Sequence, residues 1–429
     1  MARKPTIQDV FLEHFDGLRK HHCFPLPQLK AAESIMNCRT EALGGHEQCC
    51  PHGHHRRVQY HSCRHRSCPQ CAERAKAQWM ERERGRLLPC DHFHAIFTVP
   101  HELIPLWRYN RRSFVAALFD ASRDTLIQLL AQDRHLGAVP GIVMALHTWG
   151  RTLNAHPHVH CLISGGGLTT GGQWRAVKGD FLLPAAVVKR VFRGKLLSRL
   201  RHDLDTGRLK APRGDHPTVD YWLKATAKKE WNVRLQGRYT HGRGVAAYLS
   251  RYVRGGPITN TRIKSLGEGQ VQFRYHDHRD GRRKLRRVAV ERFMEQILWH
   301  VPEPGQHTVR HVGLYAHTCR AKRMACREQM GAPMPEVEPK KQTWQAYLEM
   351  LGHSDALCCP ACGAELIRGF TLPPSRHRIQ NSLIRSGSPP KASGSVQQGV
   401  EPDPLVPSRR SEVNEGDRHF YLPRCGPVN

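Results

Sequence analysis

The sequence predicts an α+β protein in which segments with the pattern of strands alternate with helical segments. Residues 92–99, 142–149 and 156–163 combine β-branched residues with two-residue alternation, as half-buried strands do. Residues 101–135 and 184–203 place apolar side chains at helical spacing. A segment rich in Cys and His precedes this region, and a basic region and a polar tail follow it.

Composition indicates a nucleic-acid partner. The chain has 429 residues, 66 Lys and Arg against 37 Asp and Glu, and a formal net charge of +29. Such an excess favours a polyanion, with nucleic acid first and an anionic membrane surface second. The length predicts two or three domains. Without a transmembrane-length apolar run or a signal peptide, we expect a cytoplasmic, nucleoid-associated protein with no membrane partner, whose 15 cysteines are thiols or metal ligands.

The first two predicted regions are an N-terminal helical region (1–36), interrupted by Pro25 and Pro27, and a zinc-binding module (37–75). In this module a CxxC pair and a preceding CxxH pair offer four zinc ligands, and the loop between the pairs has the length found in small zinc modules. The expected ligands of a structural Zn²⁺ are Cys49, His52, Cys68 and Cys71, with Cys50 and Cys63 in reserve.

A histidine-rich strand stands at the centre of the chain. Side chains two residues apart share a face of a strand, so His156, His158 and His160 should line one face. The apolar residues between and after them, Val159, Cys161 and Ile163, should face a core on the other side. With 29 histidines in the chain, a polar, solvent-facing strand would explain any one of the three, but a metal site explains the whole pattern better.

Tyr248 and Tyr252 are four residues apart in a predicted helix over 245–253, so both hydroxyls emerge from one helix face. By themselves they would indicate core packing. Beside a histidine strand that binds metal they become candidate nucleophiles. A divalent cation held by His158 and His160 could polarise a phosphodiester and activate a tyrosine hydroxyl, whose ordinary pKa is about 10.

A basic hairpin is predicted at residues 274–287, where Asp280-Gly281 indicates the turn. Its arms suit a nucleic-acid backbone. The candidate DNA-binding residues are Arg274, Arg279, Arg282, Arg283, Lys284, Arg286 and Arg287.

A second cysteine knuckle, Cys359 and Cys362, lies in the region 266–372. Cys319, Cys326 or His353 could complete a second zinc site with it. The tail from 373 to 429 is rich in Ser, Pro and Gly and is expected to be disordered.

In combination these segments resemble the insertion-sequence-ninety-one transposases, a two-tyrosine branch of the histidine–hydrophobic–histidine (HUH) endonucleases. The resemblance rests on residues 63–71, 97–103, 156–167 and 248–252 and covers roughly residues 10 to 325.

The resemblance implies an HUH endonuclease-like antiparallel sheet flanked by helices, over residues 76–265. It also implies a transposase that nicks single-stranded DNA at element ends through a 5′-phosphotyrosine, with Mg²⁺ or Mn²⁺ at the nuclease site, and joins it to a target. Tyr248 and Tyr252 match the paired nucleophiles, and His158 and His160 match the metal ligands. For the third metal ligand, His156 is the first choice and His94 the second. The oligomeric state stays open.

Two alternatives remain at this point. A plasmid replication initiator or conjugative relaxase would use the same chemistry, but the zinc module and the stretch 97–103 favour the transposase. A zinc-dependent DNA-binding regulator without nuclease activity would keep all its activity when both tyrosines are replaced by phenylalanine.

Overall fold

The computed structural model describes residues 3–211, 218–239, 256–277, 280–332, 343–350 and 352–375. All of these belong to one unit, Met1–Ile379, and the second unit, Gln380–Asn429, is not described. Tyr248, Tyr252 and Arg279 lie outside the described residues, as does the expected disordered tail from residue 376 onward.

The largest sheet runs in the order β11-β4-β5-β3-β7, with β6 paired to β5, and every strand pair in it is antiparallel. Its strands are β3 (His92–Thr98), β4 (Val139–Trp149), β5 (Ala155–Leu168), β6 (Trp174–Ala176), β7 (Val233–Tyr239) and β11 (Val309–Gly313). The expected antiparallel sheet in an α+β fold is confirmed.

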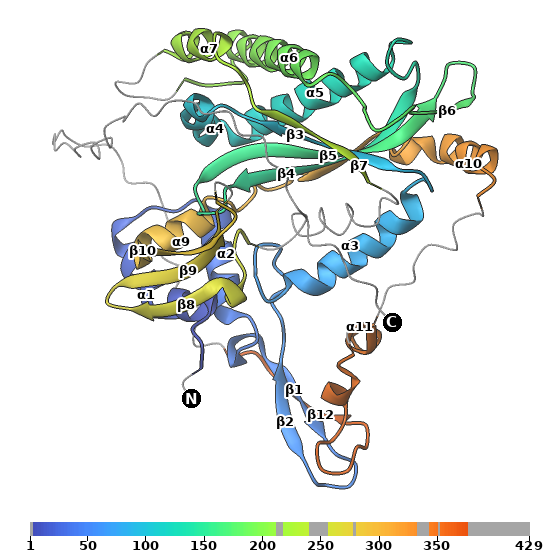
Figure 1. The fold of residues 1–429 in the computed structure, drawn as a ribbon. Helices are drawn as coiled ribbons and strands as arrows, with labels where there is room; N and C mark the ends of the chain where they lie inside the picture. The colour runs from blue at the N-terminus through green and yellow to red at the C-terminus, as the bar shows by residue number, and fades with distance from the viewer. Residues whose placement is uncertain are drawn as a thin grey trace, which may run out of the picture. The chain divides into compact units, whose positions relative to one another are not determined.

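One face of this sheet packs against helices (Figure 1). Val159, Cys161 and Ile163 of β5 are fully buried in that core, as their alternation predicted. The helices on this face are α4 (Ile104–Tyr109), α5 (Arg111–Leu130), α6 (Ala185–Asp205) and α7 (Val219–Ala227).

The opposite face of the sheet carries histidines. His158 and His160 of β5 and His94 of β3 are buried there. A smaller apolar cluster covers the adjoining part of this face with residues from α3 (Ala72–Arg86) and α10 (Arg320–Gln329). The buried histidines therefore lie beside this apolar cluster, and the packing around them restricts the orientation of their rings.

The N-terminal helices belong to a second core. Here α1 (Ile7–His21) and α2 (Leu26–Asn37) pack against α9 (Val290–Leu298) and a second antiparallel sheet, β8 (Ile263–Gly267), β9 (Gln270–His276) and β10 (Arg283–Ala289). A capping box begins α1: Thr6 accepts from Asp9 N–H, and the Asp9 carboxylate accepts from Thr6 N–H. The N-terminal helices and the segment from Ile258 to Val301, far apart in the sequence, thus complete one hydrophobic core.

A third antiparallel sheet, in the order β12-β1-β2, contains β1 (Gly45–Cys49), β2 (Arg56–Tyr60) and β12 (Ile367–Leu372). The region 266–372, expected as a single C-terminal part, therefore contributes strands to three different sheets. Strand pairing between segments hundreds of residues apart leaves no periodic signal in the sequence, which is why the expected boundaries do not follow these sheets. A short helix, α11 (Trp344–Met350), precedes β12.

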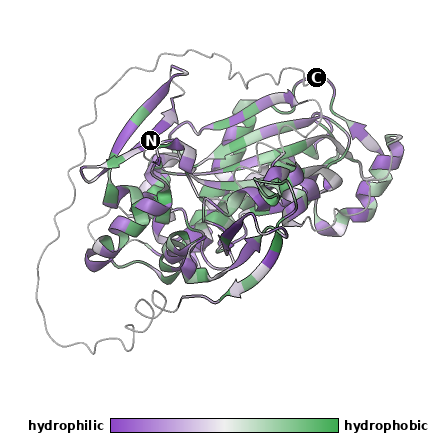
Figure 2. Ribbon diagram, turned by 90° about the horizontal axis from the view of Figure 1, so that it is seen from below, coloured by the Kyte–Doolittle hydropathy of each residue, from purple (hydrophilic) through white to green (hydrophobic). Residues whose placement is uncertain are grey.

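Among the described residues no helix is both long enough and apolar enough to cross a bilayer. Figure 2 shows hydrophilic residues interleaved with hydrophobic ones along the helices and strands.

Candidate metal centres and DNA-binding surface

Three imidazoles meet on the histidine face of the large sheet. His158 and His160 come from β5, and His147 comes from β4, directly opposite His158 in the strand register. His147 Nδ1 lies 3.2 Å from His158 Nε2 and 3.2 Å from His160 Nε2. Nitrogen ligands about 2.1 Å from a metal ion lie roughly 3.0 to 3.4 Å apart in octahedral or tetrahedral geometry. The three nitrogens therefore have the spacing of a three-histidine metal site.

Hydrogen bonds fix which ring nitrogens face this point. His158 Nδ1 lies 2.6 Å from the carbonyl oxygen of His156, and because a carbonyl only accepts, Nδ1 carries the proton and Nε2 the lone pair. The position of the proton on His160 follows in the same way from its contact with His94. Its Nδ1 donates to Gln236 Oε1 at 2.6 Å, which leaves its Nε2 to accept from His160 Nδ1 at 2.9 Å. Both Nε2 lone pairs of the β5 histidines are thus directed at the common point.

Burial keeps these rings neutral. It lowers the pKa of His158 to about 3 and the pKa of His94 to about 4, and it holds the pKa values of His147 and His160 well below their usual range. A neutral imidazole is the form that binds metal, so the site suits a cation at neutral pH.

The structure assigns different places to the two candidates for the third ligand. His94 contacts His160 and positions its ring without reaching the common point. His156 is only half-buried at the start of β5; its carbonyl accepts from His158 Nδ1 and its ring lies beside that of His158, with the centroids 4.9 Å apart, but it does not belong to the group of three nitrogens. The third nitrogen belongs to His147, which the sequence analysis did not single out. The turn between β4 and β5 is the sequence signal that could have identified His147, because a hairpin centred on Thr152 and Leu153 pairs residues 147 and 158.

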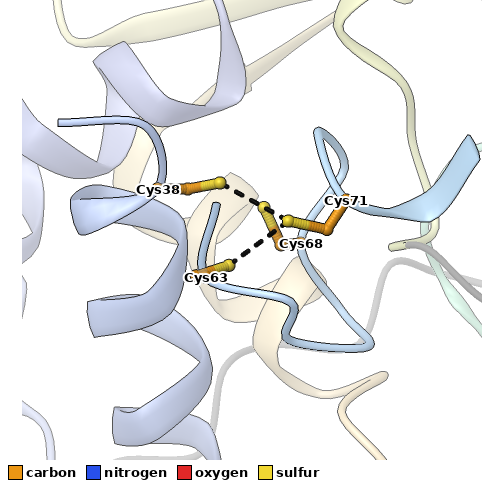
Figure 3. Close-up of side chains that lie close together, drawn as sticks. All are labelled: Cys38, Cys63, Cys68 and Cys71. Carbon is orange, nitrogen blue, oxygen red and sulfur yellow. Dashed lines mark hydrogen bonds between the residues drawn. The ribbon is translucent and has the colours of Figure 1, made fainter. Parts of the chain in front are cut away.

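Four cysteines converge at the start of α3 (Figure 3). Cys38 ends α2, Cys71 is the N-cap of α3, and Cys63 and Cys68 lie in the loop before it. Cys71 Sγ lies 3.5 Å from Cys38 Sγ and 3.6 Å from Cys63 Sγ. With Zn–S bonds of about 2.3 Å, the sulfurs of a tetrahedral zinc site lie roughly 3.8 Å apart. The cluster therefore has nearly the size of a four-thiolate zinc site.

This grouping differs from the one expected from the sequence. Cys68 and Cys71 are joined by the reserve residue Cys63 and by Cys38, not by Cys49 and His52. The physical reason is that the first pair lies at the tip of the β1-β2 hairpin, with Cys49 at the end of β1 and His52 in the loop, and β2 then separates this tip from Cys68. Cys49 Sγ instead lies 3.7 Å from the carbonyl oxygen of Ile367 in β12.

The four-cysteine cluster packs against the second hydrophobic core. Cys38 and Cys68 are fully buried among residues of α1, α2 and α9. Hydrogen bonds among the four thiols lower the pKa of the Cys71 thiol and raise those of Cys63 and Cys68, so the thiols share their protons within one cluster.

The second knuckle also has partners other than those expected. Cys362 lies close to Cys50, His52 and His54, which belong to the loop between β1 and β2. The structure does not bring Cys319, Cys326 or His353 to this group; Cys326 is buried against α3 and β11 instead.

The basic hairpin forms as predicted, with β9 and β10 paired and Gly281 in the left-handed region of a turn. The cationic side chains of this hairpin differ in exposure and in the partners they already contact. Arg283 and Arg287 lie on the exposed face of β10. Lys284 Nζ contacts the carboxylates of Asp277 and Asp280 at 2.7 and 2.8 Å, and Arg286 donates to the carbonyl oxygen of Thr152. Arg274 is half-buried and Arg282 exposed.

Comparisons with known proteins agree with a transposase that contains a zinc-binding domain. A family model described as "Putative transposase" matches residues 141–323, and another described as "Transposase zinc-binding domain" matches residues 10–99. The putative transposase y4qJ of Sinorhizobium fredii is 35% identical over 393 residues, covering 87% of this chain and 98% of the relative. The transposase for insertion sequence element IS801 of Pseudomonas savastanoi pv. phaseolicola is 29% identical over 356 residues, covering 79% of this chain and 81% of the relative.

Among solved structures, the conjugative relaxase TrwC in complex with OriT DNA matches with a TM-score of 0.21 at 21% identity, over 28% of this chain and 46% of the relaxase. The chain thus spans less than half of that protein. The two curated relatives, by contrast, are matched over most of their length, and the two family models together cover the histidine strand and the four-cysteine cluster. The chain belongs to the insertion-sequence-ninety-one family of transposases.

Proposed function

We propose that this transposase nicks and rejoins single-stranded DNA at the ends of its element, using Tyr248 or Tyr252 as nucleophile and a divalent cation held by His147, His158 and His160. The observation that carries the proposal is the convergence of three neutral imidazole nitrogens, from two neighbouring strands, within 4.8 Å of one another. Such a site in a protein with a net charge of +29 suits metal-assisted phosphodiester chemistry.

The three-histidine site provides positioning and charge. A divalent cation bound there would polarise a non-bridging phosphate oxygen and orient the phosphate for in-line attack. An all-nitrogen set suits first-row transition metals better than Mg²⁺, so Mn²⁺ is the better fit of the two ions expected from the sequence. His94 and Gln236 hold the ring of His160 in the binding orientation.

The segment that carries the tyrosines follows directly on β7, which neighbours β3 in the large sheet. Tyr239, the last described residue before it, lies with its ring centroid 6.5 Å from that of His94. The chain thus enters this segment on the histidine face, which supports the role proposed for the tyrosines.

The proposed reaction conserves bond energy. The tyrosine oxygen attacks the phosphorus, the bond to the 3′ oxygen breaks, and the products are a 5′-phosphotyrosine ester and a free 3′ hydroxyl. A 3′ hydroxyl from another strand then attacks the same phosphorus and releases the tyrosine. No nucleotide cofactor is consumed.

The test is a covalent adduct. Single-stranded oligonucleotides covering both strands of the two termini of the element are incubated with the protein and Mn²⁺, and adducts are resolved on a denaturing gel. We expect an adduct with the unmodified protein, and none when Tyr248→Phe and Tyr252→Phe are combined or when His160→Ala is made. His92→Ala, which changes a buried histidine on the same face that contacts Tyr315 instead, should keep the adduct. An adduct that survives the double tyrosine change would overturn the proposal.

A further inference from the structure

We propose that Cys50 and Cys362 hold a second zinc ion, with His52, His54 and Cys359 supplying its remaining ligands. This site is separate from the four-cysteine cluster and does not depend on the proposed nuclease chemistry. Its ligands come from two regions: the loop between β1 and β2, and the knuckle just before β12.

The donor atoms have the spacing of a zinc site. Cys50 Sγ lies 3.5 Å from Cys362 Sγ, although more than 300 residues separate them in sequence. Cys362 Sγ lies 3.6 Å from His52 Nδ1, and Cys50 Sγ lies 3.9 Å from His54 Nδ1. Around a tetrahedral zinc, two sulfurs lie roughly 3.8 Å apart and a sulfur and a nitrogen roughly 3.6 Å apart. All four donor atoms lie within 4.8 Å of one another.

Cys359 adds a fifth donor behind this group. It is buried, and its thiol interacts with those of both Cys50 and Cys362. A tetrahedral zinc takes four of these five donors, and Cys50 and Cys362, whose sulfurs are in contact across the two loops, both belong to the group of four donor atoms that lie together. These two residues therefore decide the test.

Both loops close on a glycine whose N–H bonds back to the carbonyl of a cysteine, three residues earlier in the first loop and four residues earlier in the second. Gly53 N–H donates to the carbonyl oxygen of Cys50, and Gly363 N–H donates to that of Cys359, each at 2.9 Å. Both glycines are in the left-handed region, with φ of +78° and +72°. In the first loop His52 N–H also lies 3.4 Å from Cys50 Sγ, a backbone contact that stabilises a thiolate. Two tight loops that face each other with thiols inward are a usual zinc-binding arrangement.

The surrounding sheet needs such a support. The apolar cluster beneath the β1-β2-β12 sheet consists of Cys50, Cys359 and Leu366 alone among the described residues. Large apolar side chains of the sheet, such as Ile367 and Phe370, are more than half exposed. A small β-sheet with so little buried apolar surface is marginal in water, and metal binding stabilises modules of this kind.

The site would also tie a distant segment to the N-terminal module. β12 pairs with β1 from Gly45↔Leu372 to Cys49↔Ile367, and Cys359 and Cys362 precede β12 by a few residues. The second zinc would thus fasten the segment 354–372 to the β1-β2 hairpin. Neither region holds enough of the thiols to bind the ion tightly by itself.

Thiol protection tests the site in the unmodified protein. Cys362 and Cys23 are both exposed, so without a metal ion iodoacetamide should alkylate them at similar rates. In the zinc-loaded protein we expect Cys362 to react at least tenfold more slowly than Cys23, as measured by peptide mass spectrometry, and a chelator should remove the difference. Equal rates in the zinc-loaded protein would overturn the proposal.

Zinc stoichiometry supplies an independent test. The count is made in a background carrying His158→Ala and His160→Ala, so that the nuclease site does not contribute. We expect two zinc ions per chain, falling to one in Cys50→Ser or Cys362→Ser. The matched controls are the adjacent cysteines: Cys49→Ser and Cys358→Ser should keep both ions, because their thiols contact backbone carbonyls. A count that Cys50→Ser and Cys362→Ser leave unchanged would also refute the site.

Discussion

Replacing His94 by alanine should weaken metal binding at the three-histidine site without removing a ligand. In the metal-bound form His160 needs its proton on Nδ1, which donates to His94 Nε2 at 2.9 Å, so that Nε2 is free for the ion. In the free protein the proton can move to Nε2 and donate to His147 Nδ1 at 3.2 Å. The loss of His94 therefore affects the bound form more than the free form.

The magnitude follows from the burial of this pair. His160 is 2% exposed, so its Nδ1–H would lack an acceptor in a site closed to water. An unsatisfied buried donor costs about 1–3 kcal/mol. At about 1.4 kcal/mol for each tenfold change, the dissociation constant for Mn²⁺ should rise roughly 5- to 140-fold. This range agrees with the roughly 10- to 100-fold losses typical of partners that orient metal-binding histidines.

The assay is an Mn²⁺ titration followed by calorimetry, with DNA cleavage measured over the same concentrations. His92→Ala is the matched control. His92 is also a buried histidine of β3 on the same sheet face, and burial lowers its pKa to about 4, but its ring contacts Tyr315 and the carbonyl of Cys90. It should lower the stability of the protein as much as His94→Ala does, with unchanged Mn²⁺ affinity.

Two results would refute this reasoning. Unchanged Mn²⁺ affinity in His94→Ala would show that the contact with His160 does not orient the ring. A loss as large as that in His147→Ala would make His94 a direct ligand, the role that the sequence analysis gave it as second choice.

Three further outcomes are expected. Because burial lowers the pKa of His158 to about 3 from 6.5, the unfolded chain binds more protons between these values, so the free energy of unfolding of the metal-free protein should fall as the pH drops from about 6.5. Urea unfolding at pH 7 and pH 5 measures the fall, which His158→Asn should reduce. Combining Arg283→Ala with Arg287→Ala should lower the slope of log K against log salt for single-stranded DNA by about 1.4, at roughly 0.7 for each phosphate contact. Fluorescence anisotropy at several salt concentrations checks this, and Lys284→Ala, which removes a lysine already paired with two carboxylates, should leave the slope unchanged. Finally, Cys63→Ser should release one zinc ion and lower the urea midpoint, whereas Cys49→Ser should retain the ion, because only Cys63 belongs to the four-cysteine cluster.

Local patterns of the sequence predicted the elements of the site well. The alternation around Val159 placed His158 and His160 on one face and the apolar residues in the core, as the structure has them. The turn signal at Asp280-Gly281 likewise located the basic hairpin. In both cases the determining interactions lie within one strand or one turn, so a few consecutive residues contain the information.

Contacts between separate elements were not predictable in this way. His147 becomes the third metal-binding candidate only through the register of β4 against β5, and a shift of one residue would turn its ring to the other face. Which cations of the hairpin are available depends on Asp277, Asp280 and the carbonyl of Thr152, which occupy Lys284 and Arg286.

The cysteines show the same limit on a larger scale. A CxxC spacing identifies two thiols that one turn can direct at a metal ion, but it does not identify their partners. Cys68 and Cys71 face Cys38 because α2 ends beside α3, and Cys362 faces Cys50 because β12 pairs with β1. Both pairings are products of tertiary folding, and at Cys50 and Cys362 the metal ion would join segments whose own apolar surface is too small to hold them together. Zinc binding and the docking of these segments should therefore be lost together, which is why removal of one thiol is a test of the fold as well as of the site.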